Sequence, residues 1–438
     1  MGADMFLTTR REFVSALGAS ALGARRSGSE LQTQRGSLAG FAQDFPALRQ
    51  RVNGQPLNYL DSAATTLRPQ AVINALIEYY STDNANPSPV HTLASKTAAR
   101  LSAAREAAAH FVNATSPSEI IFVRGTTEGM NLVASTWGST NLSAGDEVVL
   151  SVAEHSSNLM PWARAAERAG AKVRVADVDD EGRLTADAVK AVLSNKTRVV
   201  AFSHVSNVLG FINPVREIAR VAKTGSATVV IDGAQGAPHV KVDVQDVGCD
   251  FYVWSGHKML GPMGTGAVWG RRELLDRLPP YHVGSNMAHG VTLDHVDLEV
   301  GAQKYQAGTP DVAGPVGLHA AIRLFDRIGY EATRAHDEAL VTRGLERLRA
   351  VPRLQLLGPT QPAERVPVFT FVLGGVSATS VAQQLDRRGI AVRAGDMAAL
   401  PLLKRFGVAE AVRASAYLYS TPGDFDRLGD ALRQIVGP

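Results

Sequence analysis

The chain lacks features that mark several classes of protein. Its 438 residues contain one cysteine, Cys249, so no intramolecular disulfide can form, and an oxidising compartment is tolerated but not implied. No apolar run approaches the length that spans a bilayer, so we expect a soluble mature protein. The formal net charge is only +3, and residues 1–26 supply most of it through four arginines against Asp4 and Glu12. This charge pattern indicates no nucleic-acid surface.

The length and composition favour two domains. The chain exceeds the size at which one hydrophobic core keeps growing, and 45% of its residues are hydrophobic. We predict a large domain over residues 66–310 and a smaller α+β domain made from residues 45–65 and 311–438. Residues 1–44 are expected to form a leader and a linker. No internal repeat is visible in the sequence.

The leader resembles a twin-arginine signal peptide. Thr9-Arg-Arg-Glu-Phe13 is followed by a mildly apolar Gly/Ala-rich segment over residues 14–24. The alternatives are a short amphipathic helix or a frayed cytoplasmic tail. Two more arginines follow the segment and no Ala-x-Ala site does, so the cleavage position is open. We expect export to the periplasm, with a cytoplasmic protein as the alternative.

Apolar runs alternate with helical spacing through the first part of the chain. Strands are predicted at residues 119–123, 147–151, 173–175, 198–203, 228–232 and 251–254, and helices at 95–112, 160–169, 186–193 and 215–223. This alternation is typical of an α/β domain with a mostly parallel sheet. A long helical stretch over 316–348, strands near 366–373 and 390–393 and a closing helix over 425–435 follow. Ligands in such folds bind at the carboxyl ends of strands, where five polar residues fall: Thr126, His155, Asn207, Asp232 and Ser255.

One lysine follows the last strand of the large domain. Lys258 ends the turn Ser255-Gly-His-Lys258, and Asp232 precedes it by 26 residues at the end of another strand. An amine can hold the aldehyde of pyridoxal phosphate as a Schiff base, and a carboxylate keeps the pyridine nitrogen protonated so that the ring accepts electrons. The pair therefore predicts a pyridoxal phosphate site. The alternatives are a surface lysine on a turn and an aspartate that caps a helix.

Six ordered motifs carry a resemblance to one family. They lie at residues 124–131 (RGTTEGMN), 154–162 (EHSSNLMPW), 204–210 (HVSNVLG), 232–235 (DGAQ), 255–258 (SGHK) and 307–310 (AGTP). From about Phe45 to its carboxyl terminus the chain resembles enzymes of the class V aminotransferase fold, closest to the group-II cysteine desulfurases and selenocysteine lyases. The resemblance implies fold type I of the pyridoxal phosphate enzymes, with a mostly parallel central sheet and a smaller α+β carboxyl-terminal domain.

The resemblance also assigns roles around the cofactor. It implies that Lys258 holds the cofactor and carries the substrate's α-proton, and that Asp232 pairs with the pyridinium nitrogen. Gln235 is expected near the phenolic oxygen, and His155 is expected to stack on the ring and relay a proton. A histidine alone is more often a structural residue, so the surrounding motif carries this assignment. No metal ligand is expected.

The phosphate of the cofactor needs several donors, which helix starts supply. Gly125-Thr126-Thr127 lies between a strand and a helical pattern, and Ser255 and His257 add side-chain donors. The threonines could equally cap the helix, and both readings can hold together. Thr309 resembles a residue that the family supplies from the neighbouring subunit. We therefore expect a homodimer that completes each site.

The substrate side of the site contains arginine. Arg413, in Val412-Arg-Ala-Ser415, matches the family's clamp for the substrate α-carboxylate, with Asn207 and Arg393 expected beside it. A planar guanidinium grips a carboxylate through two parallel hydrogen bonds, which orients the bond to be broken. A surface arginine is the alternative.

The pattern breaks at the position of the family's nucleophilic cysteine. After residues 390–395 the chain continues Asp396-Met-Ala-Ala-Leu-Pro401, and Ala398 occupies the place of that cysteine. Asp396 and Met397 stand where relatives often have histidines. Cys249 is expected to be a buried structural residue just before a strand. Persulfide transfer is therefore disfavoured.

The predicted activity is what remains without that nucleophile. We expect an enzyme that acts at the α-amino group of an amino acid or amino-acyl compound, such as a carbon–sulfur lyase or a side-chain tailoring enzyme. The first alternative is transamination or epimerisation, which occur on the same fold. The second is a scaffold that binds amino acids without turnover, against which the complete set of cofactor residues argues.

Overall fold

The computed structural model of the protein describes Leu38 and residues 40–437. The predicted twin-arginine segment lies outside the described residues and stays a prediction. The part that follows begins with two short 3-10 turns, η1 (Phe41–Asp44) and η2 (Pro46–Arg49), and a small hairpin of β1 (Arg51–Val52) and β2 (Gln55–Pro56). No helix within the described ranges combines the length and apolarity needed to cross a membrane.

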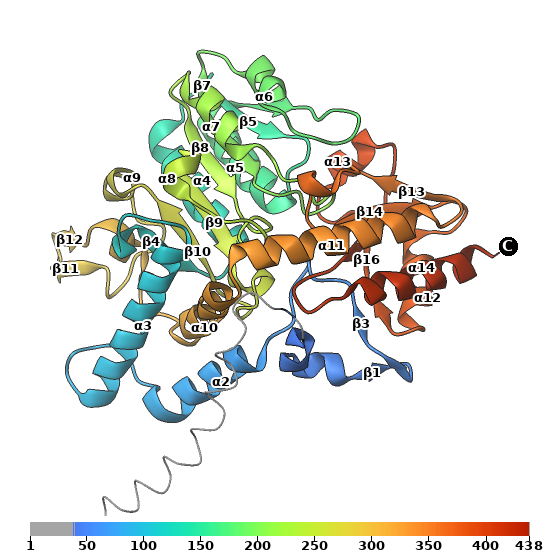
Figure 1. Cartoon of the computed structure of the whole chain (residues 1–438). Helices are drawn as coiled ribbons and strands as arrows, with labels where there is room; N and C mark the ends of the chain where they lie inside the picture. The colour runs from blue at the N-terminus through green and yellow to red at the C-terminus, as the bar shows by residue number, and fades with distance from the viewer. Residues whose placement is uncertain (1–37, 39, 438) are drawn as a thin grey trace, which may run out of the picture.

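A seven-stranded sheet forms the centre of the larger body (Figure 1). Its strands are β4 (Ile120–Val123), β5 (Glu147–Ser151), β6 (Lys172–Ala176), β7 (Thr197–Ser203), β8 (Thr228–Asp232), β9 (Phe251–Ser255) and β10 (Gly266–Gly270), in the spatial order β4-β10-β9-β8-β7-β5-β6. The pairs among β6, β5, β7, β8 and β9 are parallel, and β10 runs antiparallel to β9 and β4. The prediction of a mostly parallel α/β sheet is confirmed, and β10 is the strand it missed.

Helices cover both faces of this sheet. They are α2 (Gln70–Glu78), α3 (Thr92–Phe111), α4 (Thr126–Asn141), α5 (Ser156–Ala169), α6 (Ala186–Val192), α7 (Val215–Lys223), α8 (Val244–Val247), α9 (Arg272–Arg277) and α10 (Ala313–Ile328). Alternate residues of β9 show the layering, because successive strand side chains point to opposite faces. Phe251 and Val253 share an apolar cluster with α4 and α5, whereas Tyr252 and Trp254 share another with α3, α7 and α10.

A second, antiparallel sheet lies beside the first. Its order is β13 (Leu354–Leu357), β14 (Val368–Leu373), β17 (Ala411–Ser415) and β16 (Arg393–Gly395). Its helices are α11 (Tyr330–Arg349), α12 (Ala378–Asp386), α13 (Leu400–Arg405) and α14 (Pro422–Val436), and Figure 1 shows α11 running from the larger body across to this sheet. The amino-terminal strand β3 (Asn58–Tyr59) pairs in parallel with β15 (Ile390–Ala391). The domain boundaries themselves stay a prediction.

Period-2 alternation along β17 directs one arginine away from the core of the smaller body. Val412 and Ala414 belong to its apolar cluster with α11 and α14, so Arg413 and Ser415 face the opposite side. On that same side Thr370 of β14, the register partner of Arg413, donates its hydroxyl to the Val208 carbonyl of the larger body. This face of the small sheet therefore closes against the large sheet.

The sequence predictions differ from the structure at several boundaries. The single helical stretch over 316–348 is two helices, α10 and α11, because Gly329 between them has φ 82° and ψ 148°, which no helix continues through. The strand predicted at 390–393 is two strands, β15 and β16, in different sheets. The sequence prediction also missed β13 and β17. The remaining elements are β11 (Ala288–Val291), β12 (Val296–Leu298), η3 (Tyr79–Asp83), η4 (Pro117–Glu119), η5 (Gly256–Lys258), η6 (Gly301–Tyr305) and η7 (Pro362–Glu364).

Candidate active site

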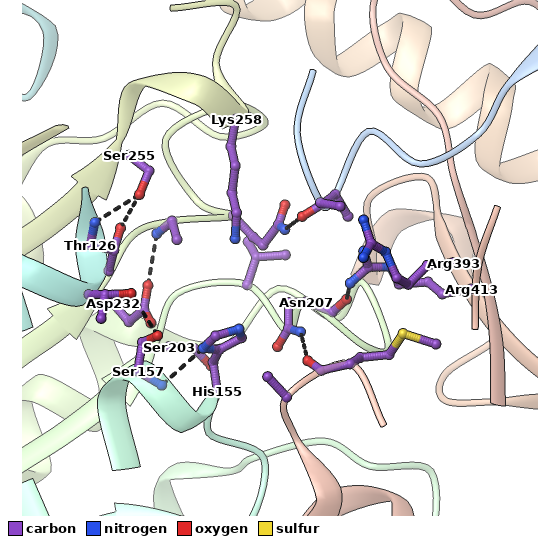
Figure 2. A pocket seen from close by; sticks show the side chains of 18 of the residues that line it. Thr126, His155, Ser157, Ser203, Asn207, Asp232, Ser255, Lys258, Arg393 and Arg413 are labelled. Atoms are coloured by element: carbon purple, nitrogen blue, oxygen red, sulfur yellow. Dashed lines mark hydrogen bonds between the residues drawn. The ribbon is translucent and has the colours of Figure 1, made fainter. Parts of the chain in front are cut away.

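A cavity of about 470 Å³ lies between the two sheets (Figure 2). Its walls come from the carboxyl ends of the large-sheet strands, from the segment before α2, and from β16, β17 and the turn after β16. The structure brings together eleven of the twelve predicted site residues in its lining: Thr126, Thr127, His155, Asn207, Asp232, Gln235, Ser255, His257, Lys258, Arg393 and Arg413. Thr309 is the one predicted site residue that does not line this cavity.

Lys258 and Asp232 line the same cavity from neighbouring strand ends. Lys258 ends η5 directly after β9, and Asp232 is the last residue of β8, which pairs with β9. Burial lowers the pKa of the Lys258 amine to about 8, against the charge of Asp232, which raises it. Burial raises the pKa of Asp232, while a hydrogen bond from the Ala234 N–H at 2.9 Å lowers it. A large fraction of the Lys258 amine is therefore neutral, and so nucleophilic, near pH 8.

His155 is a neutral imidazole of defined tautomer. It caps the start of α5, where its Nδ1 accepts the Ser157 N–H at 3.0 Å. Burial, with the positive charges of Lys258 and Arg413, lowers its pKa to about 4. The proton of the neutral ring therefore sits on Nε2, because Nδ1 is an acceptor. His155 is thus both a helix cap and a residue of the cavity wall.

The start of α4 forms a cradle of donors at one end of the cavity. Ser255 Oγ accepts the Thr126 N–H at 2.8 Å and lies 2.8 Å from Thr126 Oγ1, as the dashed lines of Figure 2 show. Thr127 Oγ1 lies 2.8 Å from Ser157 Oγ. Gly125 has φ 150°, and a Cβ there would lie 3.3 Å from Ser255 Oγ, so the backbone approaches this cradle closely. A helix start with these hydroxyls can bind an anion.

His257 adds a polar atom without a partner to this end. Its Nδ1 is buried and has no hydrogen-bond partner among the described residues. Burial lowers the pKa of the ring to about 4, with the charges of Lys258 and Arg68 acting in the same direction. A buried polar atom left unpaired costs about 1–3 kcal/mol, so a ligand that pairs with it is favoured.

The segment before α2 closes the cavity from the amino-terminal side. Gln235 donates its amide to the Ala63 carbonyl at 2.6 Å, which leaves its Oε1 for other partners. The Thr66 N–H and the Thr66 hydroxyl both donate to the His257 carbonyl at 3.0 Å. Gln235 and the turn that carries Lys258 are therefore anchored to the same segment.

Two arginines share one carboxylate on the far side of the cavity. Arg413 Nη1 donates to the Asn207 carbonyl at 2.9 Å, and its Nη2 lies 3.5 Å from Asp61 Oδ1. Arg393, directly opposite Arg413 in the β16–β17 register, pairs with Asp61 Oδ2 at 2.7 Å. Like charges opposite each other destabilise a sheet, and Asp61 offsets that repulsion. The Nε of Arg413 is buried without a partner, and burial lowers the pKa of Arg413 to about 10.

The turn after β16 forms the remaining wall. Its residues Met397 and Ala398 both have φ 54°, a left-handed conformation that L-residues rarely adopt. Asn207 donates its side-chain amide to the Met397 carbonyl at 2.9 Å. The Ser156 N–H and hydroxyl donate to the Ala398 carbonyl at 2.7 and 2.9 Å. The larger body therefore holds this strained turn in place.

Thr309 lies outside the cavity. It is exposed, and the neighbouring Gly308 donates to the Ser285 carbonyl at 2.7 Å and accepts from Asn286 at 3.0 Å. The contribution of Thr309 to a site, within its own chain or across subunits, stays a prediction.

Sequence reasoning missed several residues of the lining and its support. Ser203 ends β7, so the strand-end rule that selected Asp232 and Ser255 would also have selected it. Asp61 opens the small polar run DSAATT at residues 61–66 after an apolar segment, which was a signal for a binding turn. Ala394 and Gly395 line the cavity only because β16 lies at its edge, and no local pattern marks them.

Comparison with known proteins decides the family. Residues 58–428 match the aminotransferase class V family. The chain belongs to this family. It is 44% identical over 394 residues to a cysteine desulfurase of Synechococcus elongatus, which covers 90% of this chain but only 63% of that relative, less than two thirds of its length. A cysteine desulfurase of Klebsiella pneumoniae is 43% identical, with 90% of this chain and 96% of the relative covered.

Solved structures agree with this assignment. The crystal structure of the cysteine desulfurase CsdA of Escherichia coli superposes with a TM-score of 0.83 at 36% identity, covering 91% of this chain and 98% of that one. The chain is therefore a pyridoxal-phosphate-dependent enzyme of the class V family with the α/β architecture of fold type I.

The residues present fit this cofactor. The cavity provides a neutral amine at Lys258, a buried carboxylate at Asp232 and a helix start with hydroxyl donors at Thr126 and Ser255. The unpartnered Nδ1 of His257 lies in the same lining. Lys258 would hold the aldehyde of the cofactor, Asp232 its pyridinium nitrogen, and the helix start with its hydroxyls its phosphate.

Proposed function

We propose that the protein is a pyridoxal phosphate enzyme that acts at the α-amino group of an amino acid or amino-acyl compound and breaks a side-chain carbon–sulfur bond by elimination, without a protein persulfide. One observation supports the proposal: the cavity gathers every predicted cofactor residue except Thr309, and it is lined by Ala398, which the family resemblance puts at the place of the nucleophilic cysteine. A methyl group cannot attack sulfur. The activity then has to come from the groups around Lys258.

Arg413 would orient the substrate. Its guanidinium faces the cavity, has a free Nε, and is fixed by the Asn207 carbonyl at 2.9 Å. A substrate α-carboxylate would replace the weak contact of 3.5 Å to Asp61 and accept two parallel hydrogen bonds. Fixing the carboxylate here places the α-nitrogen towards Lys258 across the cavity.

Lys258 would move the substrate's α-proton. The bound cofactor supplies an electron sink that stabilises negative charge at the α-carbon. With its pKa lowered to about 8 by burial, the Lys258 Nζ can take up a proton near neutral pH and return it to the departing sulfur. His155, neutral with its proton on Nε2, can donate one hydrogen bond into the cavity without adding charge. Acting on cysteine and water, the overall reaction gives pyruvate, ammonia and hydrogen sulfide.

Cys249 does not supply the missing thiol. It is fully buried, and burial raises the pKa of its thiol. It precedes β9, whereas the cavity lies at the other end of that strand, beyond Ser255. Six residues of extended chain span about 20 Å. A thiolate at Cys249 is therefore out of reach of the site.

The test combines a product assay with one substitution. The native holoenzyme, incubated with cysteine, cystine and S-alkyl cysteines, is expected to form pyruvate and ammonia in equal amounts. Ala398→Cys is expected to gain release of sulfur with alanine as the co-product, and the matched Ala398→Ser, equal in size but without a thiolate, is expected not to. Conversion of the cofactor to its amine form, reversed by a keto acid, would instead indicate transamination, and an unchanged cofactor spectrum with every amino acid would leave only a binding scaffold.

We further propose that the enzyme is a homodimer in which Thr309 completes the site of the partner subunit. Thr309 is exposed, and a second cavity of about 450 Å³ opens beside the phosphate cradle, lined by Arg124, Thr127 and Tyr281 among others. Mixed dimers of Lys258→Ala and Thr309→Ala chains test this proposal, since one of their two sites would then carry neither change. Activity of the mixture above that of both parents is expected, and no such gain would show that Thr309 does not act across subunits.

We also propose export by the twin-arginine route, supported by the order of residues 9–24 alone. The full-length protein is expected in the periplasmic fraction, and replacement of Arg10 and Arg11 by lysine is expected to retain it in the cytoplasm.

A further inference from the structure

One carboxylate of the cavity has no cationic partner. Asp396 directly follows β16 and lines the cavity beside Met397 and Ala398. Within Leu38 and residues 40–437, no lysine, arginine or histidine nitrogen lies within 4 Å of it, and its one hydrogen bond comes from the Ala398 N–H to Oδ1 at 3.0 Å. The other acid of the lining, Asp232, is buried at the strand end. Asp396 is exposed, and its Oδ2 has no hydrogen-bond partner among the described residues.

Only one wall of the cavity remains for the side chain of the substrate. Under the proposed function, Arg413 takes the α-carboxylate and the α-nitrogen points towards Lys258. Figure 2 shows Lys258 and Arg413 on different sides of the cavity, with Asn207 and His155 below Lys258 in this view. The remaining wall is the turn over residues 395–398, whose Met397 carbonyl accepts a hydrogen bond from the Asn207 side chain. A side chain longer than that of cysteine therefore meets this turn.

The charge of Asp396 acts on another residue of the cavity lining. Burial, which has the largest effect, and the charges of Lys258 and Arg413 lower the pKa of His155, whereas Asp396 raises it. The lysine and arginines of the lining are Lys258, Arg393 and Arg413, and within the part of the chain that the structure describes none of them forms an ion pair with Asp396.

We propose that Asp396 is a specificity residue that binds a cationic group, such as an ammonium, at the far end of the substrate's side chain. This inference rests on the proposed function and names its substrate class: amino acids whose side chain ends in a positive charge, as opposed to a neutral or acidic end. Because Asp396 is exposed and solvent screens its charge, an effect of about tenfold in affinity is expected.

The experiment uses three ligands of equal length that differ at one end. S-(2-aminoethyl)-L-cysteine, S-propyl-L-cysteine and S-carboxymethyl-L-cysteine end in an ammonium, a methyl and a carboxylate. Their dissociation constants from the holoenzyme are measured by rapid mixing, from the first change in cofactor absorbance, so that binding is read before products accumulate. The ammonium ligand is expected to bind about tenfold more tightly than the propyl ligand, and the carboxylate ligand more weakly than both.

Three variants assign the preference to Asp396. Asp396→Asn keeps an oxygen for the Ala398 N–H but removes the charge, and the ratio between ammonium and propyl ligands should fall to about one. Asp396→Glu keeps the charge and should retain a ratio well above one even though the turn loses its acceptor. Glu331→Gln, which makes the same change in net charge on an exposed residue of α11, should leave the ratio as in the native enzyme.

Two results would overturn the inference, and they differ in what they say of the function. Equal affinities of the native enzyme for the three ligands, with elimination products still formed, would refute the subsite and leave the lyase function standing. No change in cofactor absorbance with any of the three would refute the proposed function, and the subsite with it.

Discussion

The two ends of the cavity are built in different ways. At the cofactor end, Thr126, Ser255 and Lys258 lie at the ends of strands or at the start of the helix that follows one, and Thr126 and Ser255 bond directly to each other at 2.8 Å. At the substrate end, the strained turn at Met397 and Ala398 is held by Asn207 and Ser156, which are 190 and 242 residues away along the chain. The cofactor end is made within one sheet, although Thr126 and Ser255 are 129 residues apart, and the substrate end is made where two sheets meet.

The two ends also differ in the elements that carry them. The cofactor end depends on a rigid sheet whose strand ends converge, and it gathers the predicted cofactor residues except Thr309. The substrate end includes a short turn beside the edge strand β16. Loops on a rigid scaffold commonly carry specificity in this way. Substitutions at both ends test this comparison.

The largest effect is expected at the cofactor end. Lys258→Ala removes the amine that would hold the cofactor, so at least a roughly 10³-fold loss of turnover is expected, together with loss of bound cofactor absorbance after gel filtration. Lys241→Ala, on an exposed lysine, is the matched control and should change neither. Retention of the native spectrum by the Lys258 variant would show that another group holds the cofactor.

Burial beneath the cofactor end should make stability depend on pH. Glu154 is fully buried, which raises the pKa of its carboxyl from 4.5 to about 8, while hydrogen bonds from Ser151 and Asn158 lower it. The unfolded chain loses this proton near pH 4.5 and the folded chain keeps it, so this group lowers the free energy of unfolding as the pH rises from about 4.5 to about 8. The size of this decline is on the order of 4 kcal/mol.

Glu154→Gln removes this titration while it keeps a donor and an acceptor for Asn158 and Ser151. Denaturant unfolding at pH 4.5, 6 and 8 should therefore show a flatter profile for the variant than for the native protein. Glu331→Gln, on an exposed residue, should leave the profile unchanged. Parallel profiles for Glu154→Gln and the native protein would mean that Glu154 is ionised in the folded state.

At the substrate end the two arginines should differ. Arg413→Lys replaces a buried planar clamp by a point charge, and a rise of about 100-fold in the KM for the amino acid is expected. Arg393→Lys, at an exposed residue paired with Asp61, should raise KM only a few-fold. Steady-state kinetics of the two variants, prepared side by side, make this test. Equal effects would show that both arginines, or neither, contact the substrate.

The smallest effect concerns the strain of the turn. Ala398 has φ 54°, so Ala398→Gly relieves roughly 1–2 kcal/mol of backbone strain but adds about 0.4–1 kcal/mol of unfolded-state entropy. A net gain in the free energy of unfolding of about 0.5 kcal/mol is expected. Gly125→Ala makes the opposite change at the cofactor end, where φ is 150° and a Cβ would lie 3.3 Å from Ser255 Oγ, and it should destabilise the protein and weaken phosphate binding. A loss of stability in Ala398→Gly would show that the turn is not strained.

Most strands of the larger body could be predicted because local patterns of apolar and polar residues mark them. Apolar strands such as Thr228–Asp232 were located to the residue, and Ser203, Asp232 and Ser255, which end β7, β8 and β9, line the cavity. The strand β10 was missed because its Gly-Ala-Val-Trp-Gly sequence follows a glycine-rich turn and it runs antiparallel to its neighbours. The helix break at Gly329 was missed because one glycine within a periodic pattern is compatible with a continuous helix.

The amino-acid sequence by itself determined the α/β architecture, through its periodicity, and singled out Lys258 and Asp232, which line one cavity. Ala398 at the place of the nucleophile stays a prediction from the family resemblance. Tertiary structure alone decided that Asp61 joins Arg393 to Arg413, that Asn207 and Ser156 hold the turn at Ala398, and that Asp396 faces the site without a cation. The physical reason is distance along the chain. Contacts between residues hundreds of positions apart depend on how two sheets pack, and no local pattern encodes that packing.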